Sequence, residues 1–314
     1  MSRLSLVTGG GGFIGSHLVD ALVARGDSVR VLDDFSTGLR GNLQQHGSRI
    51  EIIDGSIIDP AAVAMAVSGV QTVFHLGALA SVTRSIENPP LSHAACATGT
   101  LYVLDEARKA GVRRVVFAAS SSAYGGASNE EGQKEDQPLH ALSPYAAAKL
   151  AGEFYMQAFA HAFGLETVRL RFFNIFGPRQ RADSPYSGVI AIFTALMSMG
   201  KAPTINGDGL HCRDFTFVAN AVQALMKAGE VPGVSGKVFN VGTGRNVTIL
   251  DLVAALNDLL GTKLVAQHGP PRAGDPKFSL ADISRTKAEL GYQPEVTFEE
   301  GLRRTLEWYR TQSH

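Results

Sequence analysis

The sequence predicts an α/β fold, in which a doubly wound parallel sheet is joined by a smaller α/β C-terminal lobe. Three observations support this prediction. Short apolar runs alternate with helical patterns through the first half of the 314-residue chain. Glycines follow the first apolar run directly, and the regular alternation ends near Gly177. Such alternation is typical of a parallel sheet with helices on both faces.

The elements follow one another in a consistent order. Six apolar runs are expected to be strands of the sheet: residues 4–8, 29–32, 50–53, 72–76, 115–119 and 167–172. Helices are expected after the glycines and over residues 60–67, 94–110 and 144–163. The polar segment 125–142 is expected to be a loop over the carboxyl edge of the sheet, where ligands of this architecture bind.

Two units are expected, with a boundary where the alternation ends. Residues 1–176 would form the main domain and residues 177–314 the lobe, in which prolines are frequent. Amphipathic helices are expected in the lobe over residues 249–260 and 298–309. Parts of residues 214–242 are expected to rejoin the main sheet, with the apolar run 238–241 as an added strand.

Composition excludes several classes of function. The 29 basic and 29 acidic side chains cancel, so nucleic acid is a poor partner. Cys96 and Cys212 lie outside any metal-ligand spacing, and no metal site is expected. The apolar runs are too short to span a bilayer, and the first strand begins too early to leave room for a signal peptide. A cytoplasmic location without a membrane partner is therefore expected.

The glycine cluster is the first candidate site. Gly10, Gly12 and Gly15 satisfy the dinucleotide fingerprint, and Gly9 in place of Gly10 fits a variant of it equally well. Glycines there permit a tight turn and close approach to a diphosphate, while the following helix offers free N–H groups. Asp33 ends the second strand, where an acid would bind ribose hydroxyls. These residues predict a Rossmann-type dinucleotide site.

A tyrosine and a lysine four residues apart form the second candidate site. Ser143 and Pro144 are typical of a helix start, so Tyr145 and Lys149 are expected on one helical face. A phenol with a pKa of about 10 is a poor base at neutral pH, but a nearby ammonium and a nicotinamide cation would lower that pKa. Ser120, at a strand end, offers a hydroxyl to a substrate oxygen. Two alternatives without a catalytic role remain: Tyr145 and Lys149 could be a pair on the protein surface, and Ser120 could belong to a polar segment where a strand passes into a loop.

Taken in order, these motifs resemble the extended short-chain dehydrogenase/reductases that act on nucleotide sugars. Within that family the likeness is to UDP-glucose/UDP-galactose 4-epimerases and their N-acetylhexosamine-tolerant relatives. It runs nearly end to end and rests on residues 8–15, Asp33, 75–78, Ser120, 145–149, 171–174, 176–180, 207–209, 213–215 and 272–275. The resemblance implies NAD as the cofactor and a UDP-sugar as the substrate.

The resemblance assigns contacts residue by residue. Asp33 would hold the adenosine ribose and repel a 2′-phosphate, which favours NAD over its phosphorylated form. Further cofactor contacts are expected from Gly9, Gly12, Phe13, Ile14, Asp34, Ser36, Thr37, Gly38, Ser56, Ile57, Leu76, Gly77, Ala78, Ala80, Ala118, Tyr145, Lys149 and Phe172.

The substrate contacts implied by the resemblance lie mostly in the lobe. Asn174, Arg213 and Arg272 would bind the UDP, since arginines suit a diphosphate, and Asp275 would bind its ribose. The uracil would lie among Val189, Phe193, Thr204 and Asn206. The hexose would contact Thr83, Ser120, Ser122, Tyr145 and Ser279.

The implied reaction is an isomerisation. Tyr145 would take the proton of the sugar 4-hydroxyl while C4 gives a hydride to NAD. The 4-keto sugar would then turn in the site and receive the hydride on its other face. Ser279, four residues after Asp275, stands where narrow-specificity relatives have a tyrosine. The smaller serine predicts that N-acetylated sugars are admitted.

Other activities on this scaffold remain open at this point. Ser121 and Ser122 stand where 4,6-dehydratases need an Asp-Glu pair, so dehydration is disfavoured. Arg181 would suit a sugar carboxylate, which keeps UDP-glucuronate 4-epimerase or decarboxylase as the alternative, although an exposed loop arginine would look the same. A net dehydrogenase would consume NAD, and a non-catalytic NAD-binding sensor usually lacks the tyrosine or lysine. Cys96 departs from the family pattern, which has an asparagine there.

Two helical stretches suggest how copies of the chain associate. Residues 98–110 and 146–163 are apolar enough to form a four-helix bundle with a second copy, as family members commonly do. Burial within one monomer would explain the same pattern. A homodimer is therefore expected.

Overall fold

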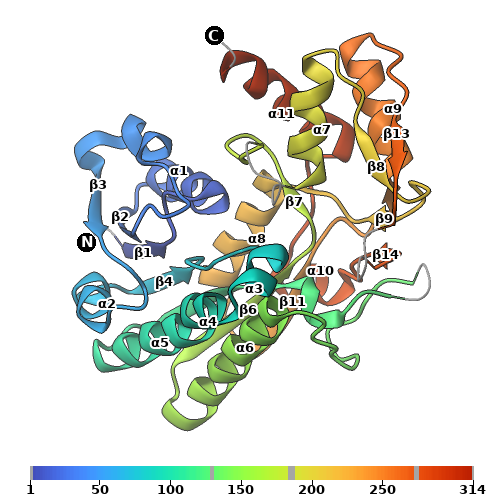
Figure 1. Cartoon of the computed structure of the whole chain (residues 1–314). Coiled ribbons are helices and arrows are strands. Elements are labelled where there is room, and N and C mark those ends of the chain that lie inside the picture. The colour runs from blue at the N-terminus through green and yellow to red at the C-terminus, as the bar shows by residue number, and fades with distance from the viewer. Residues whose placement is uncertain (1–2, 128–130, 183–187, 272–275, 313–314) are drawn as a thin grey trace.

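A seven-stranded parallel sheet forms the centre of the molecule (Figure 1). The computed structural model describes residues 3–127, 131–182, 188–271 and 276–312. The strand order is β11-β6-β5-β4-β1-β2-β3. The bounds are β1 (Leu4–Thr8), β2 (Ser28–Asp33), β3 (Ile50–Asp54), β4 (Thr72–His75), β5 (Arg114–Ser120), β6 (Glu166–Phe172) and β11 (Lys237–Val241). The six expected strands and the added strand near 238–241 are confirmed.

Helices cover both faces of this sheet, so the doubly wound prediction is confirmed. Leu6 and Val7 are neighbours on β1, yet they belong to two different buried clusters, because successive strand residues face opposite sides. The cluster with Val7 includes α1 (Phe13–Arg25) and α8 (Val218–Glu230). The cluster with Leu6 includes α2 (Pro60–Val67), α5 (Gly99–Lys109) and α6 (Pro144–Phe163).

The expected helix over residues 94–110 is wrong in one respect. Residues Ala94–Thr98 form a π-helical turn, η2, and α5 begins only at Gly99. The turn continues from α3 (Val82–Glu87) and α4 (Pro89–His93). A π-helical turn does not change the spacing of apolar residues enough to be recognised in the sequence. Such turns are frequent at functional sites. Short 3₁₀ segments, η1 (Arg40–Arg49) and η3 (Ser121–Tyr124), follow β2 and β5.

The lobe consists of helices and short strand pairs. Its helices are α7 (Val189–Ser198), α9 (Ile249–Leu260), α10 (Ser284–Leu290) and α11 (Phe298–Gln312). In the described part of the lobe, the strands form three small sheets, the first of which includes a strand from just before the boundary. The pairings are β7 (Ile175–Phe176) with β10 (Thr216–Phe217), β8 (Thr204–Asn206) with β13 (Gln267–Gly269), and β9 (Cys212–Arg213) between β12 (Val247–Thr248) and β14 (Phe278–Ser279). The two expected amphipathic helices are confirmed.

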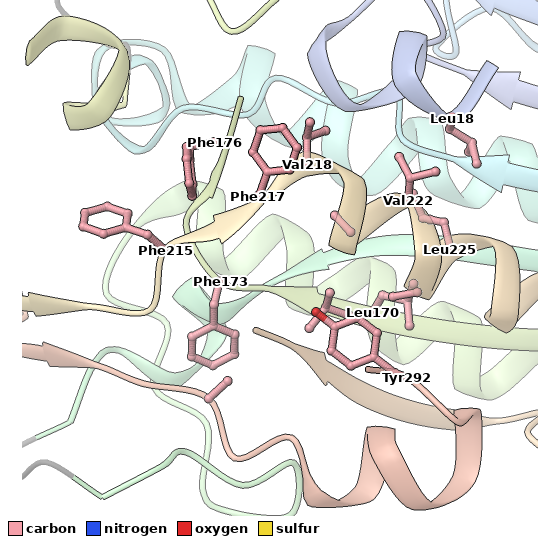
Figure 2. Close-up of a cluster of buried hydrophobic side chains, with 14 of the residues drawn as sticks. Leu18, Leu170, Phe173, Phe176, Phe215, Phe217, Val218, Val222, Leu225 and Tyr292 are labelled. Atoms are coloured by element: carbon pink, nitrogen blue, oxygen red, sulfur yellow. The ribbon is translucent and has the colours of Figure 1, made fainter. Parts of the chain in front are cut away.

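The buried core continues from the sheet into the lobe. Phe176 packs edge-on against Phe215, Phe217 and Phe298, with ring centroids 5.7 to 6.4 Å apart. Figure 2 shows how this aromatic group continues toward Leu170 of β6 and the residues of α8. The lobe is therefore fixed to the sheet by shared apolar packing, which holds its residues in place beside the carboxyl ends of the strands.

The segment expected as a loop follows η3. Its described residues, 125–127 and 131–142, contain no helix, and isolated bridges join Ala127 to Phe278 and Gln133 to Ala281. Of the helices that the structure describes, none has the length and apolar character to cross a membrane. Within the same residues, no group of three His, Cys, Asp or Glu side chains could hold a metal ion.

Candidate active site

The glycine turn after β1 needs glycine at specific positions. Gly9 has φ +70°, and a Cβ there would lie 2.8 Å from the backbone nitrogen of Gly77. A Cβ on Gly15 would lie only 2.1 Å from the carbonyl oxygen of Gly9. Gly12 is the N-cap of α1 and supplies no side-chain cap, so the first turn of the helix keeps N–H groups for a ligand. The turn therefore fits a dinucleotide diphosphate.

Two adjoining cavities, of about 200 and 820 Å³, open beside this turn at the carboxyl ends of the strands. All the residues expected to bind the cofactor line one or both of them. The smaller cavity is lined by Gly9, Gly12, Asp33, Asp34, Ser36, Thr37, Gly38, Ser56, Ile57, Gly77 and Ala78. The larger adds Phe13, Ile14, Leu76, Ala80, Ala118, Tyr145, Lys149 and Phe172.

Asp33 lies at the wall of the smaller cavity with both carboxylate oxygens held by backbone. The N–H of Gly11 donates to Oδ2 and that of Phe35 to Oδ1, each at 2.8 Å. Burial raises the pKa of Asp33, and these two hydrogen bonds oppose the rise. Each carboxylate oxygen has a second lone pair, so Asp33 is held in position and still has capacity to accept hydrogen bonds from ribose hydroxyls.

The helix that carries Tyr145 and Lys149 begins where the sequence predicts. The Ser143 hydroxyl accepts the N–H of Ala146 at 3.1 Å, and a proline follows at the first helical position. One turn along, the buried Nζ of Lys149 donates to the carbonyl oxygen of Ala118 at 2.9 Å. This bond fixes the lysine at the end of β5, on the wall of the larger cavity.

Tyr145 and Ser120 lie in the larger cavity and interact by a hydrogen bond. Ser120 Oγ also accepts the Ser122 hydroxyl at 2.9 Å and its N–H at 3.2 Å. Burial raises the pKa of Tyr145, the Cys96 thiol raises it further, and the Ser120 hydrogen bond lowers it. The expected lowering of this pKa is therefore not found in the protein alone.

The lysine does not provide that lowering here. Burial lowers the pKa of Lys149, which the nearby Cys96 and Glu153 oppose. Its ammonium donates to a backbone carbonyl and lies 4.8 Å from the ring centroid of Phe117. Of the two positive charges expected to favour the tyrosinate, the one on the nicotinamide is left as the main contributor.

Asn174 combines an unusual backbone conformation with an unpaired side-chain donor, as ligand-binding residues often do. Its φ is +36°, which asparagine tolerates at a cost, and its buried Nδ2 has no hydrogen-bond partner among the described residues. It lines the larger cavity. An unsatisfied donor on the wall of a cavity suits an anionic oxygen of a ligand.

Most of the other residues expected to bind substrate are not brought into the two cavities. Thr83, Ser122, Val189, Phe193, Thr204, Asn206, Arg213 and Ser279 line neither cavity. Arg213 and Ser279 are buried and face each other in the register of β9 and β14. Val189 and Phe193 are one turn apart on α7. Arg272 and Asp275 lie outside the described residues.

Sequence reasoning missed several residues that line the larger cavity, among them Arg84, Arg179 and Gln180. Arg84, on α3, lines both cavities and has no ion pair among the described residues, so its charge is available where they meet. Arg179 has φ +66° and pairs with Asp20 at 2.8 Å. The run Gly-Pro-Arg-Gln at 177–180 could have indicated Arg179. Nothing in the local sequence marks Arg84.

The glycine turn, the acid at the end of β2 and the Tyr/Lys helix are arranged as the resemblance to the extended short-chain dehydrogenase/reductases implies. A family model described as GDP-mannose 4,6 dehydratase matches residues 6–305. The UDP-glucose 4-epimerase of Mycolicibacterium smegmatis is 37% identical over 312 residues, which cover 98% of this chain and 99% of that protein.

Solved structures agree with this likeness. A UDP-N-acetylglucosamine 4-epimerase from Methanobrevibacter ruminantium, in complex with UDP-N-acetylmuramic acid, is 36% identical, with TM-score 0.94 and 99% of each chain covered. A UDP-glucuronic acid 4-epimerase from Bacillus cereus, in complex with NAD and a fluorinated UDP-glucuronic acid, is 29% identical, with TM-score 0.92, covering 99% of this chain and 100% of that one. The chain belongs to the extended short-chain dehydrogenase/reductases, among the UDP-sugar 4-epimerases, a family whose cofactor is NAD.

Proposed function

We propose that this protein catalyses the NAD-dependent 4-epimerisation of a UDP-hexose, and that it accepts both the UDP-glucose/UDP-galactose pair and the UDP-GlcNAc/UDP-GalNAc pair. The observation that carries the proposal is the shared cavity. Ser120, Tyr145 and Lys149 line the same space as the glycine turn, so a phenol and a nicotinamide can meet one substrate carbon. Residues 1–176 with β11 would hold NAD, and residues 177–314 would hold the UDP.

The proposed roles follow from the positions of the side chains. NAD, held by the glycine turn and Asp33, would supply the hydride acceptor and donor for C4 of the sugar. Tyr145 removes the proton of the 4-hydroxyl and later gives it back, while Ser120 orients that oxygen through its hydroxyl. Lys149 holds its charge at the end of β5 beside them. The Nδ2 of Asn174 and the guanidinium of Arg84 are placed to donate to diphosphate oxygens.

A panel of UDP-sugars tests this function. The purified protein is incubated separately with UDP-galactose, UDP-GlcNAc and UDP-glucuronate, and the C4 epimers are resolved by proton NMR. Conversion of the first two without net reduction of added NAD is expected. Stoichiometric NADH would instead identify a dehydrogenase. NAD binding with no conversion of any UDP-hexose would contradict an enzymatic role and favour a sensor.

A second substrate class has one specific observation in its favour. Arg181 is exposed and lines the larger cavity, where a cation would pair with a sugar carboxylate. UDP-glucuronate 4-epimerisation or decarboxylation is therefore the alternative. In the same panel, UDP-glucuronate would then be the preferred substrate, and release of carbon dioxide would distinguish the decarboxylase from the epimerase.

The size of residue 279 is expected to set the range of sugars. Ser279 is buried on β14 and pairs with Arg213 of β9 in the strand register. The change Ser279→Tyr is expected to lower kcat/KM for UDP-GlcNAc by about 100-fold, because its ring would occupy the space for the N-acetyl group. UDP-galactose turnover should change much less. Steady-state kinetics on both sugars gives the ratio.

Ser279→Ala is the matched control, since it removes the hydroxyl without adding a larger side chain to the proposed sugar pocket. It should leave the ratio of the two specificity constants near that of the native protein. A similar loss on both sugars in Ser279→Tyr would mean that residue 279 supports the fold and does not set the size of the sugar pocket.

We also infer that the protein is a homodimer in solution, joined through α5 and α6, which lie side by side in Figure 1. On α6, the large apolar side chain of Phe154 is exposed (61%). Phe154→Glu should dissociate the dimer in sedimentation velocity, because a charge would be buried in the contact. Met65→Glu, at an equally exposed apolar position on α2 (62%), should leave it intact. A native monomer would exclude this assembly.

A further inference from the structure

His75, the last residue of β4, is the centre of a buried series of hydrogen bonds, called here the hydrogen-bond chain. On one side, His75 Nδ1 lies 2.7 Å from Thr8 Oγ1, and this oxygen accepts the N–H of Gly77 at 3.0 Å. On the other side, His75 Nε2 lies 3.0 Å from Thr100 Oγ1, which donates to the carbonyl oxygen of Cys96 at 2.7 Å. The chain thus joins the end of β1, the exit of β4 and the π-helical turn η2.

The partners determine where the protons lie. The single hydroxyl proton of Thr100 is donated to Cys96, so Thr100 Oγ1 must accept a proton from Nε2 of His75. Nδ1 is then the acceptor, and the Thr8 hydroxyl donates to it. Every group in the chain is satisfied only if His75 is neutral and protonated on Nε2.

The surroundings of His75 keep it neutral. Its ring is fully buried and stacks on Phe117, with centroids 5.5 Å apart, and the ammonium of Lys149 lies 4.8 Å from the centroid of the same Phe117 ring. Burial lowers the pKa of His75 to about 3, and the charge of Lys149 contributes to this. Burial and the nearby ammonium therefore favour the neutral imidazole near neutral pH.

Both ends of this hydrogen-bond chain reach a small buried cluster against which Tyr145 packs. Cys96 and Ala97 of η2 form a small buried cluster with Ala148, and both Ala78 and Tyr145 pack against it. Ala78 directly follows Gly77, whose N–H is held by Thr8. His75 thus links two backbone segments, the exit of β4 and η2, that meet at the cluster against which Tyr145 packs.

We propose that His75 is a positioning residue for Tyr145, which fixes the angle of the phenol in the cavity by holding η2 and the exit of β4 at a set separation. This inference rests on the proposed function, in which Tyr145 transfers the proton. Without these hydrogen bonds, η2 and the exit of β4 would be held at the cluster beside Tyr145 by packing alone. A shift of about 1 Å at a reacting group can lower a rate about a hundredfold.

The test compares variants that cut the chain at different points. His75→Phe keeps a buried ring and removes both bonds, whereas Thr100→Val removes only the link to η2. Both should lower kcat by about ten- to a hundredfold, with the KM for the UDP-sugar within about threefold of the native value. Thr100→Ser keeps the hydroxyl and should retain native kcat.

Two spectroscopic readouts separate this inference from a merely structural role and from the function itself. In nitrogen NMR, His75 should show the Nε2–H tautomer and no titration between pH 5 and 9. With tyrosine labelled by carbon-13 and Tyr145 assigned by Tyr145→Phe, the titration midpoint of the phenol should move in His75→Phe and Thr100→Val. This second readout needs no turnover, so it stands even if no UDP-sugar is converted.

The outcomes are distinct. An Nδ1–H tautomer, a titrating His75, or an unchanged Tyr145 midpoint and kcat in both chain variants would overturn the proposal. If His75→Phe fails to fold, Thr100→Val, which leaves the bonds among Thr8, His75 and Gly77 in place, decides the question. Failure of the native protein on every UDP-sugar, with the NMR results as expected, would overturn the proposed function and leave the positioning of Tyr145 supported.

Discussion

The change Tyr145→Phe is expected to lower kcat on UDP-galactose by about a thousandfold, while NAD stays bound. A positioned general acid–base group contributes about 10²- to 10⁴-fold to a rate, and phenylalanine removes the hydroxyl that would perform the transfer. The ring itself, packed against the cluster of Cys96, Ala97 and Ala148, should keep its place. Steady-state turnover, with the NAD content measured after denaturation, gives both quantities.

The matched control for this change is on the same helix. Tyr155 is exposed and lines neither cavity, so Tyr155→Phe should retain native turnover. Because burial raises the pKa of Tyr145, its basic form grows as the pH rises, and native kcat should increase from pH 6 toward alkaline pH. That increase should be absent from Tyr145→Phe. Native rates in this variant would remove Tyr145 from the mechanism.

The change Arg171→Met is expected to destabilise the fold by about 3–5 kcal/mol, because it leaves a carboxylate buried without a partner. Arg171 Nη2 lies 2.8 Å from Glu153 Oε2, and the two side chains are 3% and 2% exposed. Nε of Arg171 also donates to Oε1 at 3.0 Å. Chemical denaturation of the native and variant proteins gives the difference in the free energy of unfolding.

A second substitution shows whether the loss comes from the uncompensated charge. In the double variant Arg171→Met with Glu153→Leu, most of the stability should return, since an apolar pair can replace a buried ion pair at little cost. Arg108→Met, which removes an exposed partner of Asp105 on α5, should leave stability nearly unchanged. If the double variant loses as much free energy of unfolding as the single one, the destabilisation comes from altered packing and not from the unpaired charge.

Features encoded by local patterns could be predicted from the sequence. The strand 4–8 and the helices 60–67, 144–163 and 249–260 match the structure at both ends, because apolar periodicity, capping residues and prolines act within a few positions of each other. The glycine turn and the Tyr/Lys helix are of the same kind. Both lie beside the same cavity because ligand sites of open parallel sheets form at the carboxyl ends of the strands.

Features that depend on contacts between distant segments could not be predicted. The π-helical turn at 94–98 includes Cys96, whose carbonyl is bound through Thr100 to His75, and no periodicity records such a bond. Arg84 becomes a cavity residue only once α3 is packed beside the strand ends. The raised pKa of Tyr145 depends on burial, which a spacing of four residues does not reveal.

The position of β11 at the edge of the main sheet has a consequence for biosynthesis. This strand, residues Lys237–Val241, pairs with β6 and comes from a part of the chain well beyond residue 176. A nascent polypeptide emerging from the ribosome cannot finish its nucleotide-binding half until those later residues appear, and until then β6 presents an unpaired edge that other chains could join. The nucleotide-binding half therefore depends on the later part of the polypeptide to complete its sheet.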